Sequence, residues 1–450
     1  MTILVFARAN FRMRILEQTN FKNDYVVVTD AVYTSIIDKY DYYLSAALDK
    51  YAHEGSVFFS DEELFNIVRR DRYLRSIIFK HALKLIYNVT GQLLNIVKKE
   101  SPRGVFSPMP ESFPIDILFR IAKRFDIKCY SFCVWAIPGY FAVIDCNHKQ
   151  FYCRSQPIED FDLKNVFLSR QNKISRYCLK QSSSMKELLK RLHMVMSNLF
   201  FRIVKLNKYS NQDVKNENYL AMAYKTKVLV LARLNLRDLN ADKYYANLDE
   251  LTVGANKKVV YLSLHYYPEA SIDYMSESTS LIDHDDLVLE ILERFSSKYI
   301  FLLKEHPAMY RCRDLTFYDK IKVYPNTYLL NPKTDYVEIL KRSNVVISWG
   351  GSISLEAPFW GVRPLNVMKP LYSVKGFDNY FLDYKDLIDN FLNKIENPNY
   401  MLEDYCNALN KIFSQILFEG DYFAEYWNNC ANLAKIFEQI LYKSLVDKDN

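Results

Sequence analysis

YIFLLKEHP at residues 299–307 and KRSNVVISWGGSISLEAPFWGVRPLNV at residues 341–367 decide how the second half of this chain folds. Each stretch contains a short apolar run that predicts a buried strand, at 299–303 and at 344–348. The first strand stops at the polar cluster formed by residues 304–307. Since open α/β sheets bind ligands at the carboxyl ends of their strands, we expect these polar side chains in a binding site.

A glycine turn follows the second predicted strand, and a helix is expected to begin near Ser352. Gly350 and Gly351 would let the backbone approach a phosphate, and the free N–H groups of a helix start favour negative charge. The hydroxyls of Ser352 and Ser354 add donors. An ordinary strand-to-helix turn, capped by the serines, would use the same residues. His306 can likewise be interpreted as a packed residue at a strand end, without a catalytic role. Two such features after two strands of one α/β unit favour a phosphate site.

The pair of features resembles the C-terminal half of GT-B glycosyltransferases of bacterial capsule and surface-polysaccharide biosynthesis. That family has a K-E-H-P segment, found here at 304–307, and a later S/T-x-x-G-S-x-x-x-E-A element, found here as SWGGSISLEA at 348–357. Upstream, YLSLHYYPEAS at 261–271 is similar to the first strand of the same domain with its L-H-Y-x-P-E signature. The resemblance implies two Rossmann-like domains that face each other across a cleft, with a nucleotide-sugar donor bound by the C-terminal one.

The same resemblance implies roles for individual residues. Lys304 and His306 would donate to the donor's phosphate, with His306 also catalytic, and Glu356 would bind sugar or ribose hydroxyls. If His306 and the glycine turn hold one phosphate, they must come from adjacent strand ends, within about 10 Å of each other. No cofactor and no metal ion are expected. The full set of expected donor-binding residues is Lys304, His306, Ser348, Gly350, Gly351, Ser352, Ser354, Glu356, His265 and Glu269.

A reactive carboxylate is expected in the first half of the chain. In SPMPESFPIDIL, residues 107–118, Glu111 stands where the family would have an aspartate, just past a predicted strand end. An acid at a helix start also has a purely electrostatic reading. Asp30 and Asp116 are the alternatives. A base would give inversion and a nucleophile retention, and the sequence leaves that choice open.

Composition restricts the class of protein. The 450 residues exceed what one core usually supports, so two domains are expected. The net charge of +6 and the pI of about 8.6 suit an anionic substrate or membrane face, but no dense Lys/Arg run indicates nucleic-acid binding. Eight cysteines without a C-x-x-C pair indicate reduced thiols in the cytoplasm and no zinc site.

Contact with a membrane is expected to be at most peripheral. The N-terminus has no signal-peptide pattern, and no run approaches 18 apolar residues. The basic apolar segment 194–205 could rest on the inner membrane surface, although amphipathic helices more often pack on a core.

Alternation of strand and helix patterns predicts an α/β protein with two doubly wound domains. The expected parts are an acceptor domain at 1–150, a helical linker at 151–256, a nucleotide-sugar domain at 257–395 and C-terminal helices at 396–450 that cross back to the first domain. Strands are predicted at 3–7, 25–29, 104–107, 128–135, 141–144, 259–264, 299–303, 321–323, 344–348 and 364–367. A long helical region is predicted at 61–97, capped by Ser60 with Glu63, and helices are predicted at 112–124, 185–205, 219–237, 283–296, 335–341, 354–360, 401–418 and 422–445.

The predicted function is transfer of a sugar from a nucleotide donor to a growing surface polysaccharide or a lipid-linked glycan. Similar Kdo transferases that use CMP-Kdo carry a Gln-Pro and a His-Pro pair; here His306-Pro307 is present, but Tyr267-Pro268 stands where Gln-Pro would be sought. A CMP-sugar is favoured slightly over UDP- or GDP-sugars. The alternatives are a CDP-glycerol-type glycerophosphotransferase and a non-catalytic scaffold that binds glycan or partner proteins.

Overall fold

The structure, a computed structural model, is described at residues 2–7, 25–30, 40–45, 51–133, 137, 139–147, 149–174, 243–251, 257–266, 270–306, 309, 313–397, 400–420 and 431–441. These residues form two compact units. Unit 1 holds the described residues up to 158 and those from 415 onward, and unit 2 holds those between 159 and 414. The domain boundaries predicted from the sequence stay predictions.

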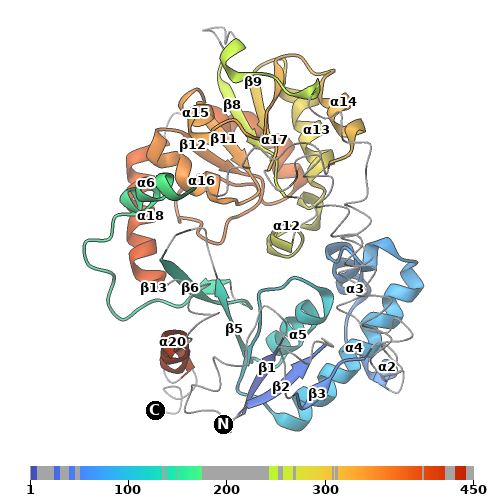
Figure 1. Cartoon of the computed structure of the whole chain (residues 1–450). Helices are drawn as coiled ribbons and strands as arrows, with labels where there is room; N and C mark the ends of the chain where they lie inside the picture. The colour runs from blue at the N-terminus through green and yellow to red at the C-terminus, as the bar shows by residue number, and fades with distance from the viewer. Residues whose placement is uncertain are drawn as a thin grey trace, which may run out of the picture. The chain divides into compact units, whose positions relative to one another are not determined.

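Unit 2 is built on a five-stranded parallel sheet (Figure 1). Its strands lie in the order β10-β9-β8-β11-β12, so the chain adds strands first on one side of β8 and then on the other. This is the doubly wound order, and its reversal point lies between β8 and β11. The strands are β8 (Val259–Ser263), β9 (Ile300–Lys304), β10 (Thr327–Leu330), β11 (Val345–Ser348) and β12 (Arg363–Asn366).

Helices cover both faces of this sheet. Successive residues of each strand point to opposite faces, so each strand contributes apolar side chains to both cores. Val260 and Leu262 pack in one core with α13 (His284–Phe295), α14 (Leu315–Ile321) and α17 (Tyr384–Glu396). Val259 and Tyr261 pack in a second core with α15 (Tyr336–Lys341) and η9 (Ala357–Trp360), which continues α16 (Ser352–Glu356). Other elements of the unit are α6 (Leu163–Ile174), η6 (Leu248–Glu250), α12 (Ala270–Met275), η7 (Thr279–Leu281) and most of α18 (Leu402–Ile416).

Unit 1 repeats this strand order on a mixed sheet. Its strands lie in the order β3-β2-β1-β4-β5-β6-β13, with a reversal between β1 and β4. The pairs from β3 to β5 are parallel, whereas β6 pairs antiparallel with β5, β7 and β13. The strands are β1 (Ile3–Phe6), β2 (Tyr25–Thr29), β3 (Tyr42–Tyr43), β4 (Gly104–Phe106), β5 (Lys128–Cys133), β6 (Tyr140–Asp145), β7 (Gln150–Phe151) and β13 (Leu417–Glu419).

The helices of unit 1 include two that cross at unusually short range. A Cβ on Gly55 of α2 would lie 1.9 Å from the carbonyl oxygen of Tyr87 in α4, and one on Gly91 would lie 2.0 Å from that of Tyr51. Glycine is therefore required where α2 meets α4. The helices are α2 (Ala52–Ser56), α3 (Asp61–Arg70), η2 (Leu74–Ser76), α4 (Phe79–Glu100), α5 (Phe113–Arg124) and α20 (Ala431–Leu441).

The predicted α/β class with two Rossmann-like doubly wound sheets is confirmed, and so is the capping box of Ser60 and Glu63. The long helical region predicted at 61–97 is divided into α3, η2 and α4, because Asp71 interrupts it. The Asp71 carboxylate accepts the N–H groups of Tyr73 and Leu74 at 2.8 and 2.9 Å, and these bonds turn the chain into η2 between α3 and α4.

Two strand and helix predictions fail for reasons of packing. Residues 321–323 are not a strand, because Asp314 caps α14 and Ile321 ends that helix; the strand is β10. Residues Leu417 and Phe418 do not continue a helix but pair with β6, where the Phe418 ring stacks on Phe141 at 5.8 Å between centroids. The predicted helices at 185–205 and 219–237 lie outside the described residues, among which no helix is long and apolar enough to cross a membrane.

Candidate active site

The carboxyl ends of β9, β8 and β11 place three predicted motifs along one edge of the unit 2 sheet. They carry, respectively, residues 304–306, residues 264–266 and the Gly350–Gly351 turn. The prediction that His306 and the turn leave adjacent strands is wrong, because β8 lies between β9 and β11. Two strand spacings, about 10 Å in all, therefore separate them, and the β8 segment comes between. This is the reversal point at which open α/β sheets bind ligands.

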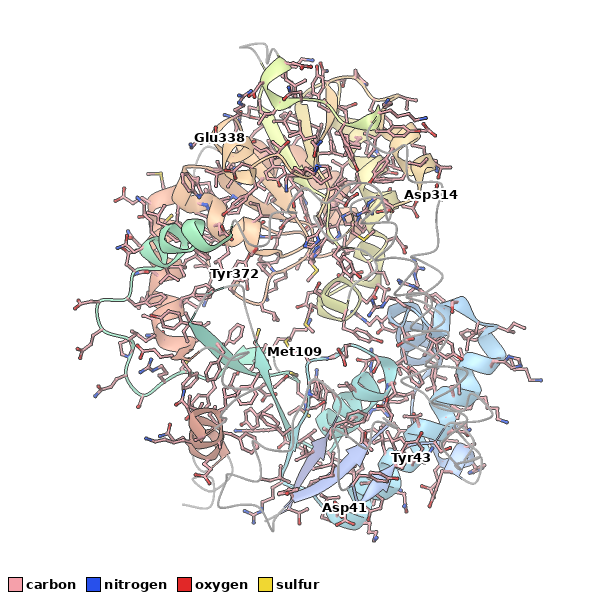
Figure 2. All side chains as sticks on the ribbon, in the orientation of Figure 1. Asp41, Tyr43, Met109, Asp314, Glu338 and Tyr372 are labelled. Carbon is pink, nitrogen blue, oxygen red and sulfur yellow. The ribbon has the colours of Figure 1, made fainter. Side chains whose placement is uncertain are left out.

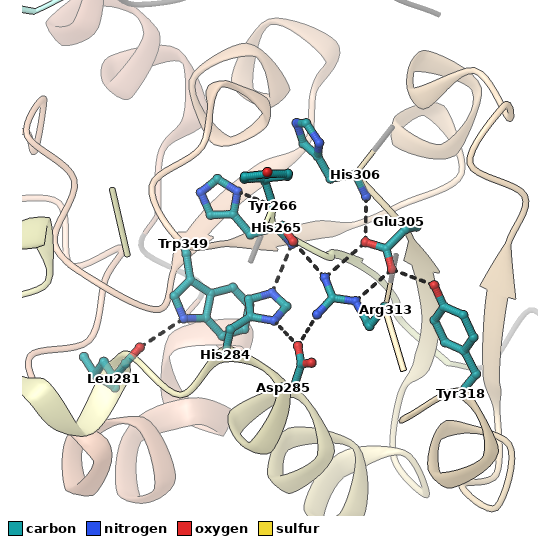
Figure 3. A network of polar contacts seen from close by, with 10 residues as sticks. All are labelled: His265, Tyr266, Leu281, His284, Asp285, Glu305, His306, Arg313, Tyr318 and Trp349. Atoms are coloured by element: carbon teal, nitrogen blue, oxygen red, sulfur yellow. Dashed lines mark hydrogen bonds and ion pairs between the residues drawn. The ribbon is translucent and has the colours of Figure 1, made fainter. Parts of the chain in front are cut away.

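Glu305 lies beneath this edge and is completely buried (Figure 3). Its carboxylate accepts a fork from Arg313, with Nε to Oε2 at 2.8 Å and Nη2 to Oε1 at 3.1 Å. It also accepts the Tyr318 hydroxyl at 2.9 Å and the His306 N–H at 3.0 Å. Burial raises the pKa of Glu305, but these four donors require the ionised, acceptor-only form.

Arg313 connects this carboxylate to two further segments. Its Nη2 donates to the carbonyl oxygen of His265 at 2.8 Å, and its Nη1 bonds to Asp285 near the start of α13. Burial alone would lower the pKa of Arg313, but the carboxylates of Glu305 and Asp285 raise it. One guanidinium thus holds the segment after β8, the segment after β9 and α13 in register.

His284 supports the β8 segment from below. Its Nε2 accepts the His265 N–H at 3.0 Å, and its Nδ1 bonds to Asp285 at 2.8 Å. The ring is fully buried against Trp349, with 4.2 Å between ring centroids. Burial is the largest influence and lowers the pKa of His284 despite the neighbouring carboxylate. A neutral imidazole with its proton on Nδ1 satisfies both bonds.

His265 presents a second neutral imidazole. Its Nδ1 accepts the N–H of Tyr266 at 3.0 Å, which leaves the proton on Nε2, 3.4 Å from the Ser271 hydroxyl. Burial, followed by the neighbouring histidines and Arg313, lowers the pKa of His265 to about 3. At neutral pH this ring is therefore an uncharged hydrogen-bond donor.

His306 is exposed to solvent and directed away from Arg313 (Figure 3). Its ring lies 5.8 Å from that of Tyr266, between centroids. Desolvation by neighbouring atoms and the positive charges of Lys304 and Arg313 lower the pKa of His306 to about 4. The side chain of Lys304 is itself largely buried at the end of β9. The edge therefore offers an exposed neutral imidazole beside a lysine.

The glycine turn is braced from within. Gly350 has a φ of 74°, which a side chain would strain. The Ser348 hydroxyl accepts the Gly351 N–H at 3.3 Å and bonds to the buried Ser354 hydroxyl at 2.6 Å. Tyr372, labelled in Figure 2, donates to the Gly351 carbonyl at 3.5 Å. Ser348 and Ser354 thus hold the turn's shape, and Ser352 is the exposed serine.

Glu356 is buried at the end of α16 and accepts the Tyr336 hydroxyl at 2.8 Å. The structure therefore brings this carboxylate to the hydroxyl of Tyr336 rather than to the surface. Glu269 lies outside the described residues. The predicted donor-binding roles of both stay predictions.

Two of the three candidate carboxylates of unit 1, Asp30 and Glu111, follow strands of its sheet. Glu111 is half-buried in the loop after β4, the strand beside the sheet's reversal point; Met109 of this loop is labelled in Figure 2. Asp30 follows β2 and is fully buried. Asp116 in α5 forms an ion pair with Arg120 at 3.0 Å. Glu111 thus lies between the end of β4 at Phe106 and Ser112, the residue that precedes α5, and its reactive role stays a prediction.

No protein-family model matches the sequence, and no curated protein matches it significantly. Among solved structures, the chain is similar to a UDP-GlcNAc 2-epimerase from Neisseria meningitidis bound to UDP-GlcNAc, with 15% identity, coverage of 99% of this chain and 100% of that one, and a TM-score of 0.25. It is also similar to Thermosulfurimonas dismutans KpsC, a beta Kdo 2,7 transferase, with 9% identity, coverage of 92% and 89%, and a TM-score of 0.35. Similarities with TM-scores this low do not support a fold or a function, so the fold assignment rests on the strand orders.

Sequence reasoning missed the residues that support the edge. Arg313 and His284 are the chief ones, and their partners are Asp285, Tyr318 and Trp349. Asp285 lies in a run of acids that looks like ordinary helix-start decoration. Arg313 carries no local pattern, since its contacts reach residues 48 positions away. The only signal for such a residue is a charged side chain in a segment that is predicted to be buried.

Proposed function

We propose that this chain is a cytoplasmic glycosyltransferase that moves a sugar from a nucleotide-activated donor to a growing cell-surface polysaccharide or lipid-linked glycan. The observation that carries the proposal is the set of donors along one sheet edge at the reversal point of unit 2: the His265 and His306 rings, Lys304 and the Gly350–Gly351 turn. Doubly wound sheets bind nucleotides at this position.

The chemistry of this edge suits a phosphate that gains charge as it leaves. His306 stays neutral at pH 7 and donates a hydrogen bond without needing to be protonated, while Lys304 supplies positive charge. Such hydrogen-bonding and charged groups stabilise the transition state more than the bound nucleotide-sugar, and they do so without a metal ion. In this proposal Glu111 acts on the acceptor as base or nucleophile, and Glu356 binds a hydroxyl of the donor.

A nucleotide panel tests the proposal directly. Thermal unfolding is followed with CMP, CDP, UDP or GDP, and we expect one of them, CMP in the first place, to stabilise the protein. At a hundred times the dissociation constant the gain is about 2.7 kcal/mol. The activated donors that carry the stabilising nucleotide are then incubated with the protein and an acceptor glycan, and the mass of the product is measured.

Two variants make the panel specific. His306→Ala should lose most of the nucleotide-induced shift, whereas His53→Ala, which removes an exposed histidine of unit 1, should keep it. If no nucleotide changes the unfolding temperature, the chain is a non-catalytic scaffold and the proposal fails. A product heavier by glycerol phosphate would replace it with glycerophosphate transfer.

A further inference from the structure

Two cysteines of unit 1 lie directly opposite each other across neighbouring strands. β5 and β6 are antiparallel, and Tyr130 pairs with Asp145. Cys129 therefore faces Cys146, the residue that follows β6, and the Cys146 N–H donates to the Cys129 carbonyl oxygen at 2.8 Å. Residues that face each other in a hydrogen-bonded pair have Cα atoms about 5.5 Å apart, a separation that is common in disulfides.

The two side chains also share one face of the sheet. Cys129 is fully buried in the core that this face forms with α4 and α5, and the half-buried Cys146 packs against the same core. Opposite residues on one face have Cβ atoms about 4.5–5.5 Å apart, whereas a disulfide needs about 3.5–4.5 Å. A shift of about 1 Å therefore closes the bond, and Cys146 belongs to the turn after β6, which can supply it.

Both cysteines are free thiols in this structure. The Cys129 thiol donates weakly to the carbonyl oxygen of Ile127 at 3.9 Å. Burial raises the pKa of both thiols, so they are protonated at neutral pH and react slowly. Cys133 offers a contrast, because it is buried on the same strand and the same face but lies opposite Ala142.

We propose that Cys129 and Cys146 form a reversible disulfide when the chain meets a low-molecular-weight disulfide such as oxidised glutathione. The Cys146 thiolate, the more accessible one, attacks a sulfur of glutathione disulfide and releases one molecule of glutathione. Cys129 then loses its proton and attacks the Cys146 sulfur, which releases the second glutathione. Two protein thiols are thereby oxidised, and one glutathione disulfide is reduced.

The crosslink would join the two parts of the unit 1 sheet. β5 is the last strand of the parallel part, and β6 begins the antiparallel part with β7 and β13. Cys129 lies near the amino end of β5, whereas Glu111 follows the carboxyl end of the parallel strand β4. The pair is therefore at the opposite edge of the sheet from Glu111. Its oxidation needs neither nucleotide nor acceptor, so its test does not depend on the proposed function.

Peptide mapping of the full chain tests the proposal. The protein is equilibrated with oxidised glutathione, its remaining thiols are alkylated in denaturant, and it is digested with chymotrypsin, which cuts after Tyr130 and so separates Cys129 from Cys133. Mass spectrometry should find Cys129 joined to Cys146, and dithiothreitol should remove the link. The exposed Cys153 should carry glutathione, which shows that the oxidant reached the protein. If Cys153 is modified while Cys129 and Cys146 are both alkylated, or if Cys146 is joined to another cysteine, the proposal is overturned.

Three variants assign the roles of the thiols. Cys133→Ser is the matched control and should form the crosslink like the parent chain. Cys129→Ser should lose the crosslink and stop at the mixed disulfide, with one glutathione held at Cys146. Cys146→Ser should leave Cys129 unmodified, because that thiol is fully buried. Loss of the crosslink in Cys133→Ser would contradict the assigned pair, and glutathione on Cys129 in Cys146→Ser would contradict the order of attack. The map of the parent chain needs no substitution, so it decides the proposal even where a variant does not fold.

Discussion

Arg313 shows how one buried residue can determine the geometry of a binding edge. Its guanidinium bonds to Glu305, to Asp285 and to the His265 carbonyl, which belong to three separate segments of unit 2. Burying these charges costs free energy, so the network adds little net stability compared with an apolar replacement. What the network provides is position: the backbone of both histidine segments is held by it.

Removing this guanidinium should be costly for that reason. Arg313→Ala leaves the Glu305 carboxylate buried without its fork, and we expect unit 2 to lose about 3–5 kcal/mol of unfolding free energy. Urea denaturation measures the loss. The matched control is Lys341→Ala, which breaks an ion pair whose side chains are 53% and 51% exposed and should cost under about 0.5 kcal/mol. Equal losses in the two variants would show that the network does not hold the edge.

The buried neutral histidines predict that stability depends on pH in one direction. Because burial lowers the pKa of His284, the unfolded chain takes up a proton below about pH 6.5 that the folded chain refuses. The unfolded state then binds more protons, so stability falls as the pH falls. Between pH 7.5 and 5.5 His265, whose pKa burial lowers to about 3, should cost about 1 kcal/mol, and His284 adds to the loss in the same direction.

His284→Gln tests the source of this slope. The variant should lose less stability than the parent chain over the same two pH units, whatever its stability at pH 7.5, because one titrating group has been removed. Urea denaturation at several pH values gives the slope. An unchanged slope would mean that His284 is not held neutral in the folded state.

At the scale of elements, the contact between α2 and α4 predicts a substitution whose sign is unusual. Replacing glycine by alanine inside a helix normally stabilises it by about 1 kcal/mol. At Gly91 the new Cβ would lie 2.0 Å from the Tyr51 carbonyl, so α2 must move away from α4. Gly91→Ala should therefore destabilise unit 1, by about 1–3 kcal/mol. Lys98→Ala on the exposed side of α4 should change stability by less than about 0.5 kcal/mol, and a stabilised Gly91→Ala protein would contradict the observed helix contact.

The strands that the sequence predicts well are those with their own apolar run. β8, β9, β11 and β12 were predicted to within one residue at each end, because parallel strands buried on both faces read as continuous apolar segments. β10 was misplaced, since Ile321 serves the core from the end of a helix. β13 was missed because its strand character comes from pairing with β6, a partner distant in sequence.

The residues of the candidate site likewise divide into those that a local sequence motif predicts and those that only long-range contacts determine. Local motifs placed His306, His265 and the glycine turn at strand ends, and the structure puts all three on one sheet edge. The sequence could not show that β8 separates β9 from β11, because the order of strands in a sheet depends on long-range pairing. For the same reason it could not find Arg313, whose role exists only after the segments meet.

At the scale of the whole molecule, the two units share one strand order but carry different chemistry at their reversal points. Unit 2 presents imidazoles, Lys304 and a glycine turn, which are donors suited to phosphate. Unit 1 presents the Glu111 carboxylate in the loop after β4, which is an acceptor suited to a hydroxyl. Under the proposed function, donor binding and acceptor activation therefore belong to separate units and can be removed separately.

Glu111→Gln tests this division, because it removes the charge and keeps the shape of the side chain. We expect turnover to fall about a hundredfold or more, while the thermal shift caused by the nucleotide stays at the parent value. His306→Ala should instead reduce both, since it touches the leaving phosphate. Glu62→Gln, at an exposed carboxylate of the same unit, is the control and should change neither. If Glu111→Gln turns over like the parent chain, the reactive carboxylate must be sought at Asp30 or Asp116. If it instead loses the nucleotide shift, Glu111 serves donor binding and the two tasks are not divided between the units.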